Sequence, residues 1–93
     1  MITVLIERTL APDMESTYEA SAKRTLHLAY QAEGFVNGET YSDIHNANKR
    51  YVFSKWRSAR DWYNWYNSEA RRNMMNELMP MLGEPEKIAL LEN

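Results

Sequence analysis

Residues 56–72 read WRSARDWYNWYNSEARR, and this stretch decides how the chain folds. It contains all three tryptophans, and seven of the eleven aromatic residues of the chain lie between Tyr51 and Tyr66. Aromatic side chains bury large areas and pack in specific geometries. The density therefore indicates either the centre of a hydrophobic core or the wall of a pocket for a flat ligand. Which of the two it is bears directly on function.

The same stretch predicts a helix that is interrupted. Ser58 with Asp61 three residues later resembles a capping box, in which Asp replaces the usual Glu. The helix that follows carries one stripe of large side chains at Trp62, Trp65, Tyr66 and Glu69. In a straight helix the next apolar residues would fall on nearly the opposite side: Met75, Leu78, Met79 and Leu82. A break near Asn67, with Ser68 capping a second segment, removes this conflict.

Outward from this region, alternating apolar residues predict four strands. They cover residues 2–8, 35–43, 49–57 and 87–92. Between the first two strands, Pro12 and Asp13 open a helix of about five turns that ends near Gly34. Its apolar line consists of Met14, Tyr18, Ala22, Thr25 and Ala29.

The element order is therefore β-α-β-β-α-β within a single domain, residues 1–93. Right-handed crossovers place both helical regions on one face of a four-stranded antiparallel sheet, which is a ferredoxin-like α+β fold. The other face of the sheet stays open, although several strands place apolar residues on it. Isologous packing against a second copy would bury that face, so we expect a homodimer.

Composition excludes several classes of protein. The net charge is −2, which argues against a general nucleic-acid binder, and there is no cysteine for a disulfide or a thiolate site. His27 and His45 have no second ligand at metal spacing, and three scattered glycines form no phosphate loop, so we expect neither a metal nor a nucleotide cofactor. The N-terminal segment turns polar after six residues, which predicts no membrane segment and a cytoplasmic protein.

The pattern W56-x-S58-x-x-x-W62-x-x-W65-x-x-S68-x-x-R71, with Glu33-Gly34-Phe35 at the second strand, resembles the antibiotic biosynthesis monooxygenase (ABM) family. The resemblance covers the whole chain. It implies a dimeric α+β barrel and cofactor-independent oxygenation of phenolic or quinol-like substrates by O2. Some members of the family degrade haem with an Asn, a Trp and a His. The Trp corresponds to Trp65, but the other two positions hold Glu7 and Met75, so we do not expect haem degradation.

Oxygenation without a cofactor needs an apolar slot for a ring, a group that favours the phenolate, and room for O2. We predict that Trp62, Trp65, Tyr66 and Met75 line the slot together with Arg71. Arg71 would stabilise a phenolate or a developing peroxide, and Glu7 or a tyrosine hydroxyl would relay a proton. Arg71 could instead pair with Glu69, Glu77 or a carboxylate of the partner chain.

Packing is the competing explanation for these residues. We favour a core role for Trp56 and Trp62, whereas for Trp65 a core role and a pocket role are equally supported. A dimer that binds a small molecule without catalysis, or a stress-related dimer, is the alternative function. RNA-recognition motifs share the element order, but residues 49–53 lack the glycine of their signature and the first strand lacks a stacking aromatic. We therefore expect no nucleic acid among the partners.

Overall fold

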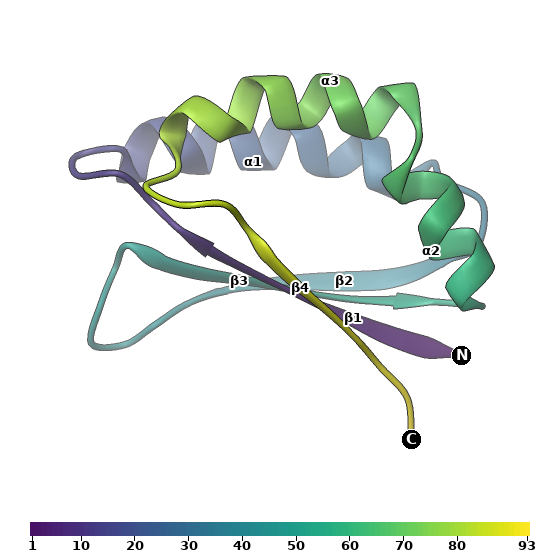
Figure 1. Ribbon diagram of the computed structural model, residues 1–93. Helices are drawn as coiled ribbons and strands as arrows, with labels where there is room; N and C mark the ends of the chain where they lie inside the picture. The colour runs from purple at the N-terminus through teal and green to yellow at the C-terminus, as the bar shows by residue number, and fades with distance from the viewer.

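The computed structural model describes residues 1–93. In chain order it contains β1 (Ile2–Thr9), α1 (Glu15–Tyr30), β2 (Phe35–Ser42), β3 (Lys49–Trp56), α2 (Ala59–Tyr66), α3 (Glu69–Leu78), the short 3-10 helix η1 (Met79–Met81) and β4 (Lys87–Leu91). The strands form one antiparallel sheet in the order β2-β3-β1-β4. In Figure 1, α1 and α3 lie side by side over one face of the sheet, α2 lies at its end, and the other face is uncovered. The predicted ferredoxin-like α+β fold is confirmed.

The faces of the strands follow the predicted alternation. β1 pairs with β3 so that Val4 lies opposite Ser54 and Ile6 opposite Val52, and these side chains point toward the helices. Ten apolar residues form the buried core, including Trp56 and Trp62, each 1% exposed. The core role that we predict for these two tryptophans is confirmed.

The interruption of the second helical region also lies where the sequence places it. α2 ends at Tyr66, Asn67 is its C-cap, and α3 begins after Ser68. The hydroxyls of Ser58 and Ser68 each accept a backbone N–H three residues later, at 3.1 Å in both cases. Each serine therefore satisfies one of the free N–H groups of its own short helix.

The first helix is shorter than predicted at both ends. Asp13 has φ of 63°, and a residue in the left-handed region cannot belong to a right-handed helix, so α1 begins only at Glu15. At the other end, Tyr30 is the last helical residue and Gly34 has φ of 84°. A Cβ added to Gly34 would lie 2.3 Å from the carboxyl carbon of Asp61. Glycine at this position therefore allows the start of α2 to pack against the turn.

Polar contacts hold α1 against α3. Ser21, which the predicted apolar line of α1 omits, is 2% exposed and donates its hydroxyl to Glu77. Arg24 forms an ion pair with the same carboxylate. The Ser21 hydroxyl and the Arg24 charge lower the pKa of Glu77 below its ordinary value. The ionised carboxylate therefore favours the folded state.

We predict that the contact between Ser21 and Glu77 makes the stability of the protein sensitive to acid. A carboxyl group with a lowered pKa contributes stability above its unfolded-state pKa of about 4.3 and loses it as the pH falls through the folded-state value. Replacing Ser21 with alanine removes the first cause of the lowered pKa. Urea unfolding at pH 7 and at pH 3 should show a smaller loss of stability on acidification for Ser21→Ala than for the wild type. An equal loss in both proteins would show that Glu77 titrates alike in the folded and unfolded chains.

The uncovered face of the sheet carries apolar side chains from every strand. Leu5 and Tyr51 are half-buried, whereas Phe53, Tyr41 and Leu91 are between 39% and 49% exposed. The rings of Tyr41 and Phe53 are in edge contact, with centroids 5.8 Å apart. None of the helices has both the length and the apolar character needed to cross a bilayer.

Candidate functional site

The aromatic residues of the fold-determining stretch form one cluster between α2 and the sheet. The ring centroids of Trp62 and Trp65 lie 5.6 Å and 6.4 Å from that of Trp56, and Phe35 meets Trp56 edge-on at 5.3 Å. The indole N–H of Trp56 donates to Ser54 Oγ at 3.0 Å, so the buried ring has no unpaired donor. The cluster thus has a fixed geometry.

A cavity of about 60 Å³ lies beside this cluster, under the helices. Most of the side chains around it are apolar, and they come from β1, α1, β2, β3, α2 and α3. Trp62, Trp65 and Met74 form part of the wall, and the guanidinium-bearing side chains of Arg8 and Arg71 also reach it. One water occupies about 30 Å³ in the liquid, and an empty volume of roughly 150 Å³ holds benzene. The cavity therefore has room for a molecule of two or three heavy atoms, and a larger ligand requires the side chains around it to move apart.

Arg71 belongs to the first turn of α3 and is only 5% exposed. Its Nη2 donates to Glu86 Oε1, and its guanidinium carbon lies 4.8 Å from the ring centre of Tyr66 and 5.9 Å from that of Trp62. The Nε atom of Arg71 is buried and has no hydrogen-bond partner. A buried charged donor without a partner costs free energy, so this atom is available to an anionic ligand.

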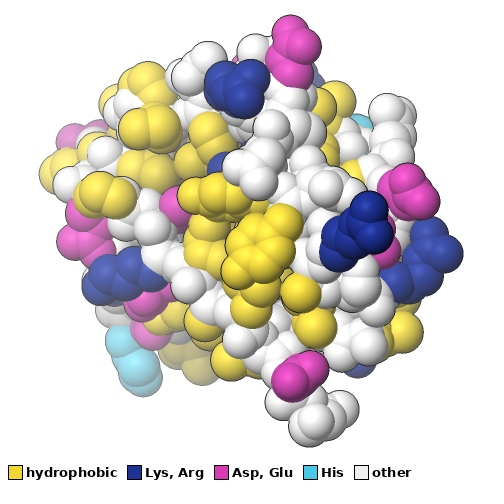
Figure 2. All heavy atoms as spheres, turned by 45° about the vertical axis from the view of Figure 1, so that its right-hand side comes forward, with side chains coloured by type: hydrophobic (Ala, Val, Ile, Leu, Met, Phe, Trp, Pro, Cys, Tyr) yellow, Lys and Arg dark blue, Asp and Glu magenta, His cyan; other side chains and the backbone are white.

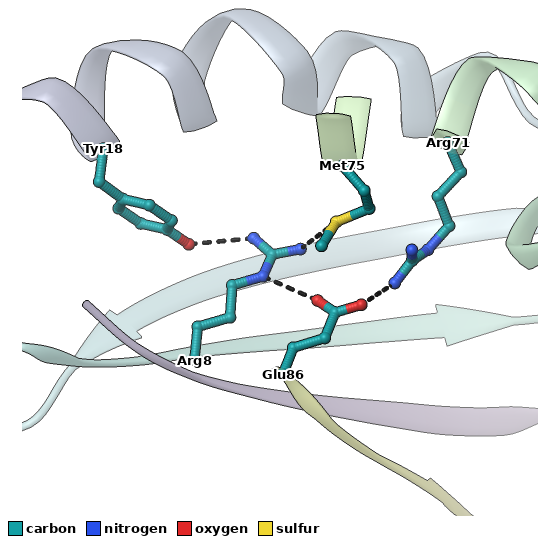
Figure 3. Close-up of polar contacts among 5 residues, drawn as sticks. All are labelled: Arg8, Tyr18, Arg71, Met75 and Glu86. Atoms are coloured by element: carbon teal, nitrogen blue, oxygen red, sulfur yellow. Dashed lines mark hydrogen bonds and ion pairs between the residues drawn. The ribbon is translucent and has the colours of Figure 1, made fainter. Parts of the chain in front are cut away.

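Arg8 is the second buried arginine, and it shares the carboxylate of Glu86 (Figure 3). Its Nε donates to Glu86 Oε2 at 3.0 Å, and its Nη1 donates to the Tyr18 hydroxyl at 3.0 Å. The third donor, Nη2, points at Met75 Sδ, 3.9 Å away. Burial by itself would lower the pKa of Arg8, but Tyr18 and Glu86 together raise it above its ordinary value. Arg8 therefore stays protonated.

Two guanidinium groups thus share one carboxylate in the interior, which leaves one positive charge in excess. A single buried charge is stable only if it is paired or well hydrogen-bonded. The Tyr18 oxygen, the Met75 sulfur and the rings of Trp62 and Tyr66 supply partial compensation. The remaining imbalance favours a ligand that carries negative charge or develops it during a reaction.

The structure brings together three of the predicted slot residues. Trp62, Trp65 and Arg71 lie at the cavity wall. Tyr66 is 44% exposed and covers Arg71 from outside. Figure 2 shows hydrophobic side chains between charged ones on the side of the molecule where α2 lies. Met75 is buried, but it lies at Arg8 and beside a second hollow at the end of α3, not at the cavity.

The structure does not bring Glu7 to this group. Glu7 lies opposite Tyr51 on the uncovered face of the sheet, where it pairs with Lys49 at 3.4 Å. The pairing that we considered for Arg71 with Glu69 or Glu77 within the chain is wrong. Arg71 pairs with Glu86, because β4 returns alongside β1 and the residue that precedes it points under α3.

Arg8 and Glu86 are not among the residues predicted for the site, although the strand pattern carries a signal for both. Ile2, Val4 and Ile6 face the helices, and the next residue of that alternation is Arg8. In the same way Ile88 of β4 faces the helices, and the residue two positions before it, on the same face, is Glu86. A basic and an acidic residue at inward positions of neighbouring strands are a sign of a buried ion pair. Tyr18 was expected on the inner line of α1, and it lies there.

No group of three or more His, Cys, Asp or Glu side chains is arranged to hold a metal ion. The titratable groups of the site are the arginines, Glu86 and the tyrosine hydroxyls. These groups can bind an anion, orient it and stabilise charge that develops on it.

Fold and site together define a class of small α+β proteins with ferredoxin-like topology and an aromatic- and arginine-walled hollow between the sheet and its helices. The model of the antibiotic biosynthesis monooxygenase family matches residues 1–77, so the chain belongs to this family. A search of curated proteins gives no match.

Several solved structures share the fold at low sequence identity. A candidate antibiotic biosynthesis monooxygenase from Bordetella bronchiseptica has a TM-score of 0.91 at 14% identity, covering 99% of this chain and 95% of its own. Another candidate from Nitrosomonas europaea has a TM-score of 0.89 at 8% identity, with 100% and 98% covered. SnoaB from Streptomyces nogalater, described as a cofactor-independent oxygenase, has a TM-score of 0.86 at 12% identity, with 99% and 92% covered. At these identities the likeness shows the fold alone.

Proposed function

We propose that the protein is a cofactor-independent monooxygenase that acts on a small phenol- or quinol-like substrate. The observation that carries this proposal is the excess positive charge of Arg8 and Arg71 at an apolar cavity, with Arg71 Nε buried and unpaired. Membership of the family supports it, as does the structural likeness to SnoaB, which is described as a cofactor-independent oxygenase.

The reaction requires no electron donor besides the substrate. A phenol and O2 yield a quinone and water: one oxygen atom becomes the new carbonyl, the other leaves as water, and the phenol supplies the four electrons. A phenol of ordinary pKa, about 10, is mostly protonated at neutral pH. A nearby guanidinium favours the phenolate, which is the electron-rich form that reacts with O2. Arg71 and Arg8 are the groups in the structure that supply this charge, and Arg71 also offers a free donor to a developing peroxide.

Oxygen uptake tests the proposal. We expect the wild-type protein in metal-free buffer to consume O2 faster than the buffer blank with at least one member of a hydroquinone panel. Arg71→Lys keeps the positive charge but loses the planar guanidinium group with its several donors. We expect this variant to consume O2 about 10²-fold more slowly, which is the loss typical for removal of one hydrogen-bond donor to a developing charge. Arg72→Lys is the matched control, because Arg72 is the next residue of α3 and is exposed. Uptake at the blank rate across the whole panel would favour a binding protein without catalysis.

We also propose that the protein works as a homodimer joined through the uncovered sheet face. The apolar side chains on that face, Leu5, Tyr41, Tyr51, Phe53 and Leu91, form the kind of surface that monomeric proteins seldom expose. Sedimentation at micromolar concentration should give twice the chain mass of 11.0 kDa. Phe53→Glu is expected to give the single-chain mass, because a carboxylate at the centre of the interface would be buried without a partner. Tyr63→Glu, at an exposed position of α2, should leave the dimer intact.

A further inference from the structure

The buried arginines carry a charge that the side chains around them do not balance. Arg8 and Arg71 are both paired with the carboxylate of Glu86, so two positive charges meet one negative charge and one positive charge is left over. Each arginine is only 5% exposed, and salt ions in bulk solvent screen buried charges much less than exposed ones. An anion inside the protein would complete the balance.

Two hydrogen-bond donors at the cavity remain for a ligand. One is Arg71 Nε, which is buried and has no partner. The other is the hydroxyl of Tyr18, because its oxygen accepts from Arg8 Nη1 at 3.0 Å and its own hydrogen is left for another acceptor. Tyr18 and Arg71 both line the cavity, and in Figure 3 they reach toward the pair of Arg8 and Glu86 from opposite sides, from α1 and α3. A ligand in the cavity therefore meets a charged donor from α3 and a neutral donor from α1.

We propose that the cavity is a binding site for a small monovalent anion. The single excess positive charge matches a single negative charge. The volume of about 60 Å³ has room for two or three heavy atoms. Most of the wall is apolar, so an anion must leave its hydration water behind, which costs far more for a divalent ion such as sulfate than for a monovalent one. Azide, a linear monoanion of three nitrogen atoms, meets all three conditions and serves as the probe.

The anion site does not require turnover, but it has a consequence for the proposed oxygenase. The donors that hold the anion are the ones that would hold a phenolate or a developing peroxide, so the anion and the substrate exclude each other. Azide should therefore raise the KM for a hydroquinone and leave kcat unchanged. This consequence rests on the proposed function, whereas binding of azide does not.

Arg71→Met separates the anion site from general attraction of azide to a positive protein. Methionine keeps a long side chain but removes both the excess charge and the free Nε donor, and it leaves Arg8 and Glu86 as a neutral pair. Arg72→Met is the matched control. It removes the same charge from the next residue of α3, which is exposed and does not line the cavity.

Binding is measured by the infrared stretching band of azide, which shifts when the ion leaves water for a less polar site. We expect saturable binding to the wild type in chloride-free buffer, with sulfate at equal ionic strength unable to displace the azide. Arg71→Met should weaken binding about tenfold or more, equivalent to ~1.4 kcal/mol. Arg72→Met should change it by less than about twofold. Wild-type crystals soaked in azide should show the ion in the cavity, at hydrogen-bond distance from Arg71 Nε and the Tyr18 hydroxyl.

The wild-type crystal decides the proposal even if Arg71→Met fails to fold. Water alone in the cavity, or azide only at surface lysines, overturns the anion site, and so does equal binding by the wild type and Arg71→Met. Azide in the cavity of a protein without oxygen uptake would support the anion site and refute the oxygenase proposal. Oxygen uptake without azide binding would have the opposite meaning, so the two failures are distinguishable.

Discussion

Replacing Glu86 with glutamine is expected to lower the free energy of unfolding by about 3–5 kcal/mol, because it leaves a buried charge network without its anion. Glu86 accepts hydrogen bonds from Arg8 and Arg71, each of which is 5% exposed. The amide has nearly the same shape, so the change removes charge with little change in packing. Two guanidinium groups would then face each other with no carboxylate between them.

Urea unfolding followed by far-UV circular dichroism measures the effect. Glu84→Gln is the matched control, because Glu84 is exposed and accepts only the Thr9 hydroxyl, at 3.0 Å, so its loss should stay within about 0.5 kcal/mol. Adding Arg8→Met to Glu86→Gln restores the excess of one positive charge and should recover part of the stability. If Glu86→Gln behaved like Glu84→Gln, water would have to reach the arginines, and Glu86 would not be the group that compensates their charge.

The network also shows which features of this protein could be predicted from its sequence. The strands follow from alternation of apolar residues, and the break at Asn67 follows from two apolar stripes that one straight helix cannot bury together. Both are local patterns within about twenty residues. The Arg8–Glu86 pair joins positions 78 residues apart, and its partners meet only because β4 returns to lie beside β1.

In the candidate site, too, the features that come from local patterns were predictable and those that depend on the whole fold were not. Trp62, Trp65 and Arg71 were predicted to line one hollow because they share a helical region, and they do line it. The size of the cavity depends on how the helices pack over the sheet, which no residue pattern records. The positive φ of Asp13, which delays the start of α1, was likewise missed, because aspartate adopts that conformation only in particular turns.

Replacing Trp56 with alanine is expected to cost about 3–5 kcal/mol, which is a large part of the 5–15 kcal/mol that stabilises a typical domain. The side chain is 1% exposed and lies between Phe35, Trp62 and Trp65. Its removal would also leave Ser54 Oγ without its indole donor. The truncation therefore adds a lost hydrogen bond to the loss of buried apolar contacts.

Thermal and urea unfolding of Trp56→Ala, with Tyr63→Ala as the control, tests this expectation. Tyr63 belongs to the same aromatic stretch but is 51% exposed, so its truncation should change stability by less than about 0.5 kcal/mol. A similarly small effect for Trp56→Ala would mean that Trp56 is not a core residue. The cavity would then be bordered by a mobile ring and not by a fixed wall. A large effect would instead mean that Trp56 is a fixed part of the wall beside the cavity.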